Sequence, residues 1–264
     1  MKISNFKNVY IKDAATVVGK LEGEGPLGSL FDMCESDSYF GKDSWEEAEA
    51  EMCGRAVGIL LGKTGTDDSN VELMLGGDLL NQCTATGFTA ADFPIPYLGL
   101  YGACSTAAEG MLIGGAFVSG GFADNAITLA SSHFCSSERQ FRYPLEYGSL
   151  RTPTAQNTVT GAGAFMLTNE KCDIRLSRAL AGRVNINGIT DANNMGAAMA
   201  TAAVDTVLRY FDETGESAAD YDIISTGDLG MEGYEIACEL FVDLTRAGDS
   251  RTAVCLCMTM KNRM

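Results

Sequence analysis

The fold of this 264-residue chain is decided by the stretch Tyr101-Gly102-Ala103-Cys104-Ser105-Thr106-Ala107. An apolar strand runs into these small residues, and an Ala/Gly-rich helix is predicted to begin around Ser105. Because small residues allow a tight turn, Cys104 is expected at the N-terminal end of that helix. Unpaired N–H groups and the positive end of the helix dipole stabilise a thiolate or a bound carboxylate there. The alternative is a buried structural cysteine, since cysteine is among the most buried residue types.

Strand-like and helix-like segments alternate around this stretch, which predicts a mostly parallel sheet covered by helices. Ser44 and Glu47 form a capping-box pattern, so a helix is predicted to begin at Ser44. The first 40 residues are predicted to be irregular. Further strands are predicted at 71–75, 97–101, 127–130, 162–167, 174–180 and 221–226, and a further helix at 195–211.

The composition is that of a folded α/β protein. Hydrophobic residues make up 46% of the chain, and 30 Gly accompany only 5 Pro, which suits many tight strand–helix turns and excludes a disordered chain. No apolar run reaches the roughly 18 residues of a membrane span, and no long apolar region follows the N-terminal lysines. We therefore expect an intracellular protein without a secretory signal.

The charge and the cysteine usage exclude several classes of function. A formal net charge of −16 argues against nucleic acid and against direct attachment to an anionic membrane surface. An anionic ligand is still compatible, because backbone dipoles and a few Arg side chains reverse the potential locally. Nine Cys without repeated CxxC spacing and a single His do not predict a zinc site. The thiols are expected to be free in a reducing cytosol, and neither a metal nor a cofactor is predicted.

Two further kinds of side chain are candidates for the site of Cys104. His133, the single histidine, ends a predicted strand, and the carboxyl ends of parallel strands meet in one crevice. Arg139 and Arg142 stand out in an acidic chain, because an Arg fork grips a carboxylate through two hydrogen bonds. The alternatives are a structural histidine and ion pairs of the arginines with neighbouring glutamates such as Glu138.

Eight short blocks follow one another along the chain. They are Gly25-Pro26-Leu27-Gly28, Gly77-Asp78-Leu79-Leu80-Asn81-Gln82, Gly102-Ala103-Cys104-Ser105-Thr106, Ser131-Ser132-His133, Glu138-Arg139-Gln140-Phe141-Arg142-Tyr143-Pro144, Thr158-Val159-Thr160-Gly161, Gly188-Ile189-Thr190-Asp191 and Thr226-Gly227-Asp228-Leu229. Together they resemble the stage V sporulation protein AD family of spore-forming Bacillota. The resemblance covers roughly residues 8–241, and its specificity comes from the number of ordered blocks.

The resemblance implies a thiolase-like fold, which consists of two similar α/β halves descended from condensing enzymes. It places Cys104 where those enzymes keep their acyl-accepting nucleophile. For function it implies non-catalytic binding of dipicolinic acid (pyridine-2,6-dicarboxylic acid), taken up into the developing spore with membrane proteins of the same operon. The expected location is the cytoplasmic side, peripheral to the spore inner membrane. The candidate ligand-binding residues are Cys104, His133, Arg139, Ile189 and Asp191.

The chain departs from the family pattern towards its C-terminal end. The family continues well past Thr226-Gly227-Asp228, and residues 242–264 have no clear helical or strand period and do not resemble that continuation. We therefore expect a thiolase-like α/β domain over 1–241 that is incomplete relative to the family, with the N-terminal half and a little of the second half. Residues 242–264 are expected to be a poorly specified tail.

The alternative function is a thiolase-like acyltransferase with Cys104 as its nucleophile, which predicts a thiol of low pKa. Condensing enzymes take a catalytic His or Asn from the second half of the fold, and its absence argues against this alternative. An incomplete fold also exposes apolar sheet and helix surface, which leaves self-association or a homodimer open.

Overall fold

A mixed β-sheet forms the centre of the larger of the two units into which the chain divides. This sheet unit comprises Asn5–Glu146 and Asn157–Ala179, and the helical unit comprises Leu180–Met264 with Met1–Ser4 and Tyr147–Gln156. The computed structural model describes residues 2–141, 157–191 and 194–246, and the side chains of the last helix up to residue 241. Most of the predicted tail, from residue 247 onward, therefore lies outside the described residues.

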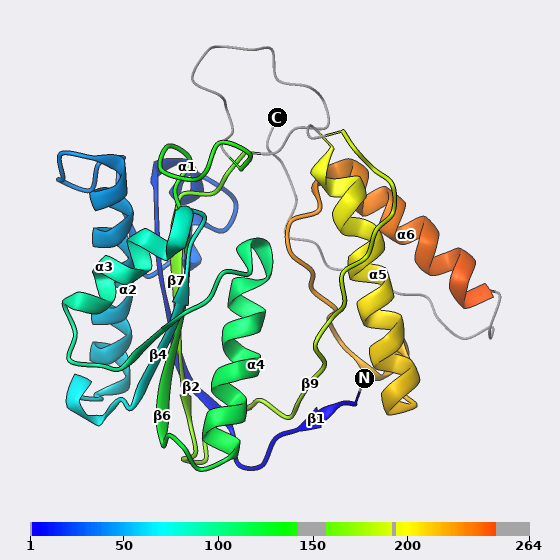
Figure 1. The fold of residues 1–264 in the computed structure, drawn as a ribbon, viewed down its shortest axis with the longest axis horizontal. Helices are drawn as coiled ribbons and strands as arrows, with labels where there is room; N and C mark the ends of the chain where they lie inside the picture. Colours follow the sequence, from blue (N-terminus) through cyan, green and yellow to red (C-terminus); the bar gives the residue numbers. More distant parts are fainter. Residues whose placement is uncertain (1, 142–156, 192–193, 247–264) are drawn as a thin grey trace. The chain divides into compact units, whose positions relative to one another are not determined.

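Seven strands form the sheet, and most of them run in one direction (Figure 1). They are β2 (Tyr10–Val18), β3 (Met33–Cys34), β4 (Leu73–Gly77), β5 (Tyr97–Gly99), β6 (Asn125–Ser132), β7 (Gly161–Thr168) and β8 (Ile174–Arg175), in the order β3-β2-β7-β6-β4-β5 with β8 beside β2. Parallel ladders join β2 to β3 and β4 to both β5 and β6. Strand β7 runs antiparallel between β2 and β6, so these two share one direction. The predicted mostly parallel sheet is confirmed.

Strand β2 corrects the prediction that the first 40 residues are irregular. It pairs with β7 over nearly its whole length, from Tyr10 opposite Thr168 to Val18 opposite Gly161. The polar side chains that interrupt its apolar pattern have ionic partners far along the chain. Lys12 pairs with Glu170 at 3.5 Å. These distant partners and the long ladder stabilise a strand that the local sequence does not predict.

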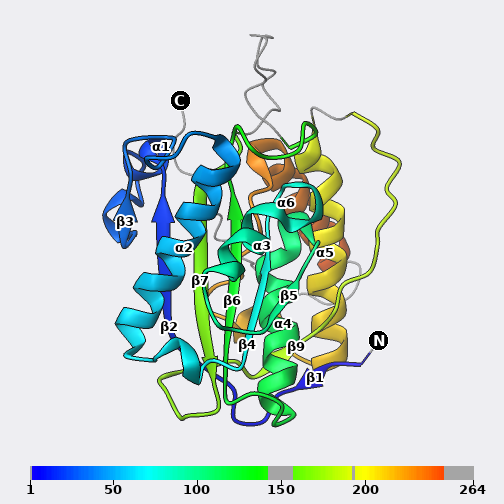
Figure 2. The ribbon, with the colours of Figure 1, turned by 60° about the vertical axis from the view of Figure 1, so that its left-hand side comes forward.

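Helices cover both faces of the sheet (Figures 1 and 2). On one face lie α2 (Trp45–Thr64) and α3 (Thr84–Ala91), and on the other lies α4 (Thr106–Ser119). The predicted start of α2 is confirmed, because the Ser44 hydroxyl accepts a hydrogen bond from the Glu47 N–H at 3.2 Å. The shorter helical turns of this unit are α1 (Lys20–Gly23), η1 (Gly28–Leu30), η2 (Asp68–Asn70), η3 (Asn81–Cys83) and η4 (Ala103–Ser105).

Two apolar clusters, one on each face, make up the core of the sheet unit. Helix α2 buries Met52, Ala56 and Leu60, each four residues apart, against the sheet. Successive residues of β4 point to opposite faces, so Met74 packs with α2 and Leu75 packs on the side of α4. Each fully buried side chain of this size stabilises the fold by about 1.5–3 kcal/mol.

Glycines let α4 lie directly on the sheet. A Cβ at Gly114 would lie 2.8 Å from Cδ1 of Leu167 and 3.1 Å from Cδ1 of Leu75. A Cβ at Gly110 would lie 3.2 Å from Cβ of Thr128. The Ala/Gly-rich sequence after Cys104 is therefore the consequence of close helix–sheet packing, and this packing fixes where α4 begins.

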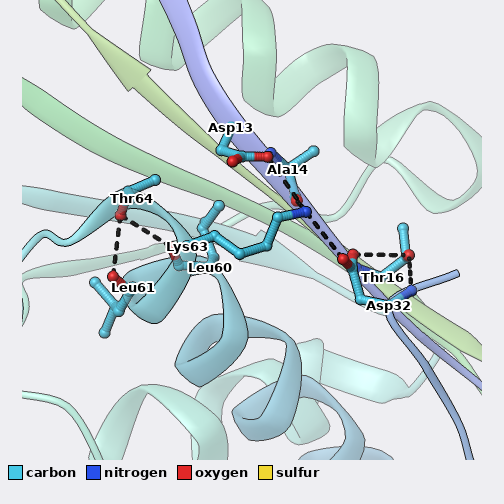
Figure 3. Close-up of polar contacts among 8 residues, drawn as sticks. All are labelled: Asp13, Ala14, Thr16, Asp32, Leu60, Leu61, Lys63 and Thr64. Carbon is cyan, nitrogen blue, oxygen red and sulfur yellow. Dashed lines mark hydrogen bonds and ion pairs between the residues drawn. The ribbon is translucent and has the colours of Figure 1, made fainter.

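The C-terminal turn of α2 is tied to β2 by Lys63 (Figure 3). Its Nζ donates to the Ala14 carbonyl at 2.6 Å and to Oδ1 of Asp32 at 2.9 Å, and it pairs with Asp13 at 3.3 Å. Oδ2 of Asp32 in turn accepts from the Thr16 backbone N–H at 2.9 Å. These contacts fix the register of α2 on the sheet, which sets the position of every residue on its buried face.

The remaining predicted elements of both units are found with shifted ends, except one. Strand β4 lies two residues later than predicted, β6 and β7 are longer, and the predicted strand 174–180 divides into β8 and the short β9 (Arg178–Ala179). Another two-residue strand, β1 (Ser4–Asn5), lies outside the main sheet. The strand predicted at 221–226 is wrong. Without a long ladder to join, these residues form a single bridge at Ile224.

The helical unit is built on two packed helices. They are α5 (Met195–Thr214), which extends the predicted helix by three residues, and α6 (Gly230–Arg246), which ends five residues past the predicted boundary at 241. A short turn, η5 (Ala218–Asp220), lies between them in the sequence. A Cβ at Gly233 would lie 2.6 Å from the Gly196 carbonyl oxygen, so glycines allow the helices to approach closely. Ala200, Val204 and Phe241 belong to the apolar cluster between them.

Candidate functional site

Three loops leave the sheet at one edge, where the parallel strands β4, β5 and β6 end. The loop after β4 begins with Asp78. The Cys104 turn (residues 100–105) follows β5, and the His133 loop (residues 133–141) follows β6. Cys104 and His133 therefore leave the same edge of the sheet, as the positions of the strand ends predicted.

The Cys104 turn is tight and strained. Ala103 has a φ of 48°, in the left-handed region that residues with a side chain rarely adopt. The Gly102 carbonyl accepts hydrogen bonds from the Ser105 N–H at 3.0 Å and from the Ser105 hydroxyl at 2.8 Å. A Cβ at Gly102 would lie 2.2 Å from Oε2 of Glu109, so the turn requires glycine there. The turn presents Cys104 as an exposed residue two positions before the start of α4.

The electrostatics of the Cys104 turn favour a neutral thiol. Protein atoms around the sulfur remove water from it, and this desolvation raises the pKa of the Cys104 thiol although the residue as a whole is exposed. A hydrogen bond from the Cys104 backbone N–H opposes the effect and is weaker. The Glu109 carboxylate, beside Gly102, adds negative charge near the start of α4. The pKa of the Cys104 thiol is thus shifted away from the thiolate that was expected at the helix end.

A buried hydroxyl lies two residues beyond Cys104, at the first residue of α4. Thr106 is 2% exposed, and its Oγ1 has no hydrogen-bond partner among the residues that the structure describes. A Cβ at Gly77, the last residue of β4, would lie 2.9 Å from the Thr106 methyl group. Sequence reasoning did not single out Thr106, although it directly follows the Cys-Ser pair of the turn. A buried hydroxyl without a partner is available to a ligand.

The loop after β4 is held by a buried carboxylate, Asp78. Its Oδ1 accepts from the Leu80 N–H at 2.9 Å, and its Oδ2 accepts from both the N–H and the hydroxyl of Thr86 at 2.8 Å. Farther along, the Cys83 thiol donates to the Leu100 carbonyl at 2.9 Å. The loop after β4 is thus bonded to the start of the Cys104 turn.

The side chain of His133 is buried in the protein and is not exposed at its surface. The ring is 0% exposed. Its Nδ1 accepts from the Cys135 N–H at 3.1 Å, so the proton is on Nε2, which lies 2.9 Å from the Ser38 carbonyl and donates to it. Burial lowers the pKa of the imidazole and keeps it neutral. Both ring nitrogens are therefore engaged with the backbone, and within the described chain neither bonds to Cys104.

Arg139 lies on the surface of the His133 loop. It is exposed and has no ion-pair partner among the described residues. The residue before it, Glu138, anchors the loop: its N–H donates to the Leu79 carbonyl, and its Oε1 accepts from the Asn81 N–H, both at 2.8 Å. The alternative pairing of Arg139 with Glu138 is thus not observed. The neighbouring candidate, Arg142, lies outside the described residues.

The other two predicted ligand residues, Ile189 and Asp191, belong to the helical unit. Both are exposed. The Ile189 N–H donates to Oδ1 of Asn187 at 3.1 Å, and the Asp191 carbonyl accepts from the Asn194 N–H at 3.1 Å. Their role stays a prediction.

The described residues contain no group of three His, Cys, Asp or Glu side chains arranged to hold a metal ion. Within the same residues, every helix is too short or too polar to cross a bilayer.

Comparison with known sequences identifies the family. A family model described as stage V sporulation protein AD matches residues 2–259. The chain belongs to the stage V sporulation protein AD family. This family member is 42% identical over 232 residues to the stage V sporulation protein AD of Bacillus subtilis (strain 168), across 88% of this chain and 69% of the relative. The resemblance stated from the sequence blocks is confirmed, and with it a role in sporulation.

Solved structures place this family member in the thiolase-like fold. The 3-oxoacyl-(acyl carrier protein) synthase III of Pseudomonas aeruginosa PAO1 is similar with a TM-score of 0.57 and 16% identity, over 88% of this chain and 79% of that one. A cerulenin-bound variant of OleA from Xanthomonas campestris is similar with a TM-score of 0.61 and 14% identity, over 90% and 80%. At these identities the likeness establishes the fold and no activity, and the predicted fold class is confirmed.

Proposed function

We propose that this sporulation protein binds dipicolinic acid without catalysing a reaction and serves its uptake into the developing spore. Its partners would be membrane proteins of the same operon, and its place would be the cytoplasmic side, peripheral to the spore inner membrane. The observation that carries the proposal is the Cys104 turn, an exposed cysteine whose thiol has a raised pKa at the position where the family resemblance places a condensing-enzyme nucleophile. A site that exposes a neutral thiol is suited to contact a ligand rather than to attack one.

The anionic character of the ligand matches the groups at this edge of the sheet. The N-terminus of the 14-residue helix α4 offers the positive end of its dipole to a carboxylate. The buried Thr106 hydroxyl offers a further hydrogen bond. The exposed Arg139 guanidinium, without an ion-pair partner in the described chain, offers a bidentate contact to a second carboxylate.

The remaining predicted residues take different parts in the proposal. His133 supports the loop from within, because both of its ring nitrogens are engaged. Ile189 and Asp191 are proposed as ligand contacts from the family resemblance alone, and their alanine variants test that assignment.

Calorimetric titration of pyridine-2,6-dicarboxylate into the protein tests the proposal. We expect saturable binding at one site, weakened about tenfold or more by Arg139→Ala, since a charge-assisted bidentate contact is lost. Arg175→Ala is the matched control, because Arg175 is an exposed arginine on β8, paired with the amino end of β2 at the opposite edge of the sheet. Absence of saturable heat in the unsubstituted protein would overturn the proposal.

The second candidate function is acyl transfer by Cys104, which the condensing-enzyme fold favours. The base that such a nucleophile needs is not supplied by His133, whose nitrogens are both hydrogen-bonded. Mass spectrometry after incubation with an acyl-CoA separates the two functions. A covalent acyl group on Cys104 would replace the binding proposal, and an unmodified Cys104 supports it.

We also propose that a homodimer forms through the edge strand β5. Within the described residues no strand pairs with its outer side. Apolar side chains are exposed near this edge, with Leu98 44%, Tyr101 62% and Phe88 67% exposed. An open edge with apolar neighbours favours pairing with a second copy. Light scattering that gives a monomer mass would contradict this proposal.

A further inference from the structure

We infer that Glu49 is a positioning residue for the loop that carries Arg139, and that its protonation is coupled to anion binding at the proposed site. The coupling to a ligand rests on the proposed function, whereas the effect of Glu49 on the loop does not. The inference begins from a buried carboxyl group that the proposed binding site leaves unexplained.

Glu49 joins three parts of the sheet unit. It lies on the buried face of α2 and is 0% exposed. Its Oε1 accepts from the Ser131 hydroxyl at 2.8 Å, and its Oε2 accepts from the Ser136 hydroxyl. Ser131 is near the end of β6 and Ser136 is in the His133 loop. A single carboxyl group thus connects the helix layer, the strand end and the loop.

The charge of Glu49 has no counter-charge. None of the described Lys or Arg side chains forms an ion pair with it, and the groups that act on it electrostatically are the Asp78 and Glu46 carboxyls and the Cys53 thiol. Burial, with a smaller contribution from these acids, raises the pKa of Glu49 to about 7 against the opposing hydrogen bonds of the two serines. Glu49 therefore changes its charge near neutral pH.

The hydroxyl of Ser136 has a hydrogen-bond partner whether Glu49 is ionised or protonated. When Glu49 is ionised, the hydroxyls of Ser131 and Ser136 both donate to it. When it takes a proton from solvent, its O–H donates to the Ser136 oxygen. Ser136 can then turn its own proton to the His133 carbonyl, which lies 3.5 Å from its Oγ. Only O–H protons move, and the loop exchanges one pattern of hydrogen bonds for another.

The altered bonds lie a few residues from Arg139. The His133 carbonyl also accepts from the Ser137 N–H at 3.1 Å, and Glu138 then fastens the loop to the segment after β4. A change at Ser136 is therefore transmitted to the backbone that presents Arg139. A dicarboxylate bound at the same edge adds negative charge, so it favours the protonated form of Glu49. By linkage, binding takes up a proton and tightens as the pH falls through about 7.

The fluorescence of Trp45 reports on the loop without any ligand. Trp45 is the single tryptophan, and its ring centroid lies 5.3 Å from that of His133 and 6.0 Å from that of Phe134. We expect a fluorescence transition near neutral pH that Glu49→Gln abolishes, because Gln keeps the shape and cannot ionise. Glu47→Gln is the matched control, since Glu47 is exposed on the same helix and is not among the groups that shift the pKa of Glu49. Titration of His133 gives a separate change at lower pH, which both variants retain.

Substitution of the serine partners keeps the inference testable if the Glu49 variant fails to fold. Ser136→Ala removes a donor to the ionised form, so the midpoint of the transition shifts to higher pH. Ser132→Ala is its control, because the Ser132 hydroxyl donates to the Val159 carbonyl at 2.7 Å and not to Glu49. A transition that Glu49→Gln retains, or that Ser136→Ala leaves unshifted, would overturn the positioning role.

The affinity for pyridine-2,6-dicarboxylate tests the coupling. Between about pH 8 and pH 6 we expect the affinity of the unsubstituted protein to rise about 3- to 10-fold, and that of Glu49→Gln to stay flat. Equal pH dependence in the two proteins would overturn the coupling. If no dicarboxylate binds at any pH while the ligand-free transition is present and lost in Glu49→Gln, the proposed function and the coupling fail and the positioning role stands.

Discussion

The Cys104 turn and the His133 loop leave the same edge of the sheet and differ in nearly every physical respect. The Cys104 turn is exposed and strained, and most of its hydrogen bonds lie within the turn itself. The His133 loop buries its histidine and is bonded to α2, to the segment after β4 and to the Ser38 carbonyl. The first is arranged to meet a ligand and the second to hold its position. A cysteine and a histidine at one strand edge are therefore not by themselves a catalytic pair.

The largest expected effect is a loss of stability when the buried hydrogen bonds of Asp78 in the loop after β4 are removed. Asp78→Ala leaves the Leu80 N–H and both donors of Thr86 without their acceptor. The free energy of unfolding should fall by about 3–5 kcal/mol, measured by chemical denaturation. Asp92→Ala, an exposed aspartate at the end of α3, is the control and should change it by less than about 0.5 kcal/mol. Equal losses in both variants would show that Asp78 does not hold the loop.

The next largest effect is the contribution of Glu49 to the pH dependence of the free energy of unfolding. The pKa of Glu49 is raised in the folded state from 4.5 to about 7, so the folded protein binds more protons than the unfolded chain in this window. Its contribution is therefore fully present at low pH and is lost as the pH rises through the folded pKa. Relative to the unsubstituted protein, Glu49→Gln should gain roughly 3 kcal/mol between about pH 4.5 and 8.

The free energies of unfolding of Glu49→Gln and the unsubstituted protein must be compared, because His133 changes the pH dependence of stability in the opposite direction to Glu49. Burial lowers the pKa of His133, so its contribution is present above the unfolded pKa and is lost as the pH falls through the folded pKa. This term is common to Glu49→Gln and the unsubstituted protein and cancels in the comparison. A constant difference in the free energy of unfolding across this pH range would contradict the assignment to Glu49.

How much of this was predictable depends on which contacts are local. The turn at Cys104, the cap at Ser44 and the end of β6 before His133 follow from neighbouring residues, and the sequence predicts them. The tautomer of His133 depends on Ser38, which lies 95 residues away. Strand β2 was missed because Lys12 and Asp13 interrupt its apolar pattern, and their partners Glu170 and Lys63 are also far away in the sequence.

Glu49 had a signal in the sequence that was missed. It shares one helical face with Met52, Cys53 and Ala56, all of which are 0% exposed. An acid at that spacing is on the buried face, although its neighbours Glu46 and Glu47 suggest a solvated one. Its serine partners come from β6 and the following loop, so its role required the fold.

A smaller effect concerns the unpaired hydroxyl of Thr106. Thr106→Val replaces a buried oxygen that has no partner in the described chain with a methyl group, so stability should rise by up to about 1 kcal/mol. If this hydroxyl binds the dicarboxylate, calorimetry should show a several-fold weaker affinity in the same variant. Thr128→Val is the control, because its buried hydroxyl is also unpaired and lies within β6. If Thr106→Val binds the dicarboxylate with unchanged affinity, Thr106 does not belong to the binding site.

The smallest effect is the removal of the negative charge beside the turn. The Glu109 carboxylate lies next to Gly102, where it opposes an anion at the start of α4. Glu109→Gln should strengthen dicarboxylate binding about 2- to 5-fold, because charge interactions in partly exposed positions are worth less than about 1 kcal/mol. Weaker binding in this variant would mean that Glu109 assists the ligand.

Protection of Cys104 from alkylation tests most directly whether the ligand binds beside this thiol. The mass of the Cys104 peptide shows at the same time whether the thiol forms a covalent bond to the ligand. Peptide mass spectrometry follows the rate at which iodoacetamide modifies Cys104 as pyridine-2,6-dicarboxylate is added. Cys34, also exposed, is the internal control. We predict that Cys104 is protected in proportion to ligand occupancy, that Cys34 is not, and that Cys104 carries no ligand-derived mass. Equal alkylation of both cysteines at saturating ligand, or a covalent adduct on Cys104, would contradict a non-catalytic binding site at the Cys104 turn.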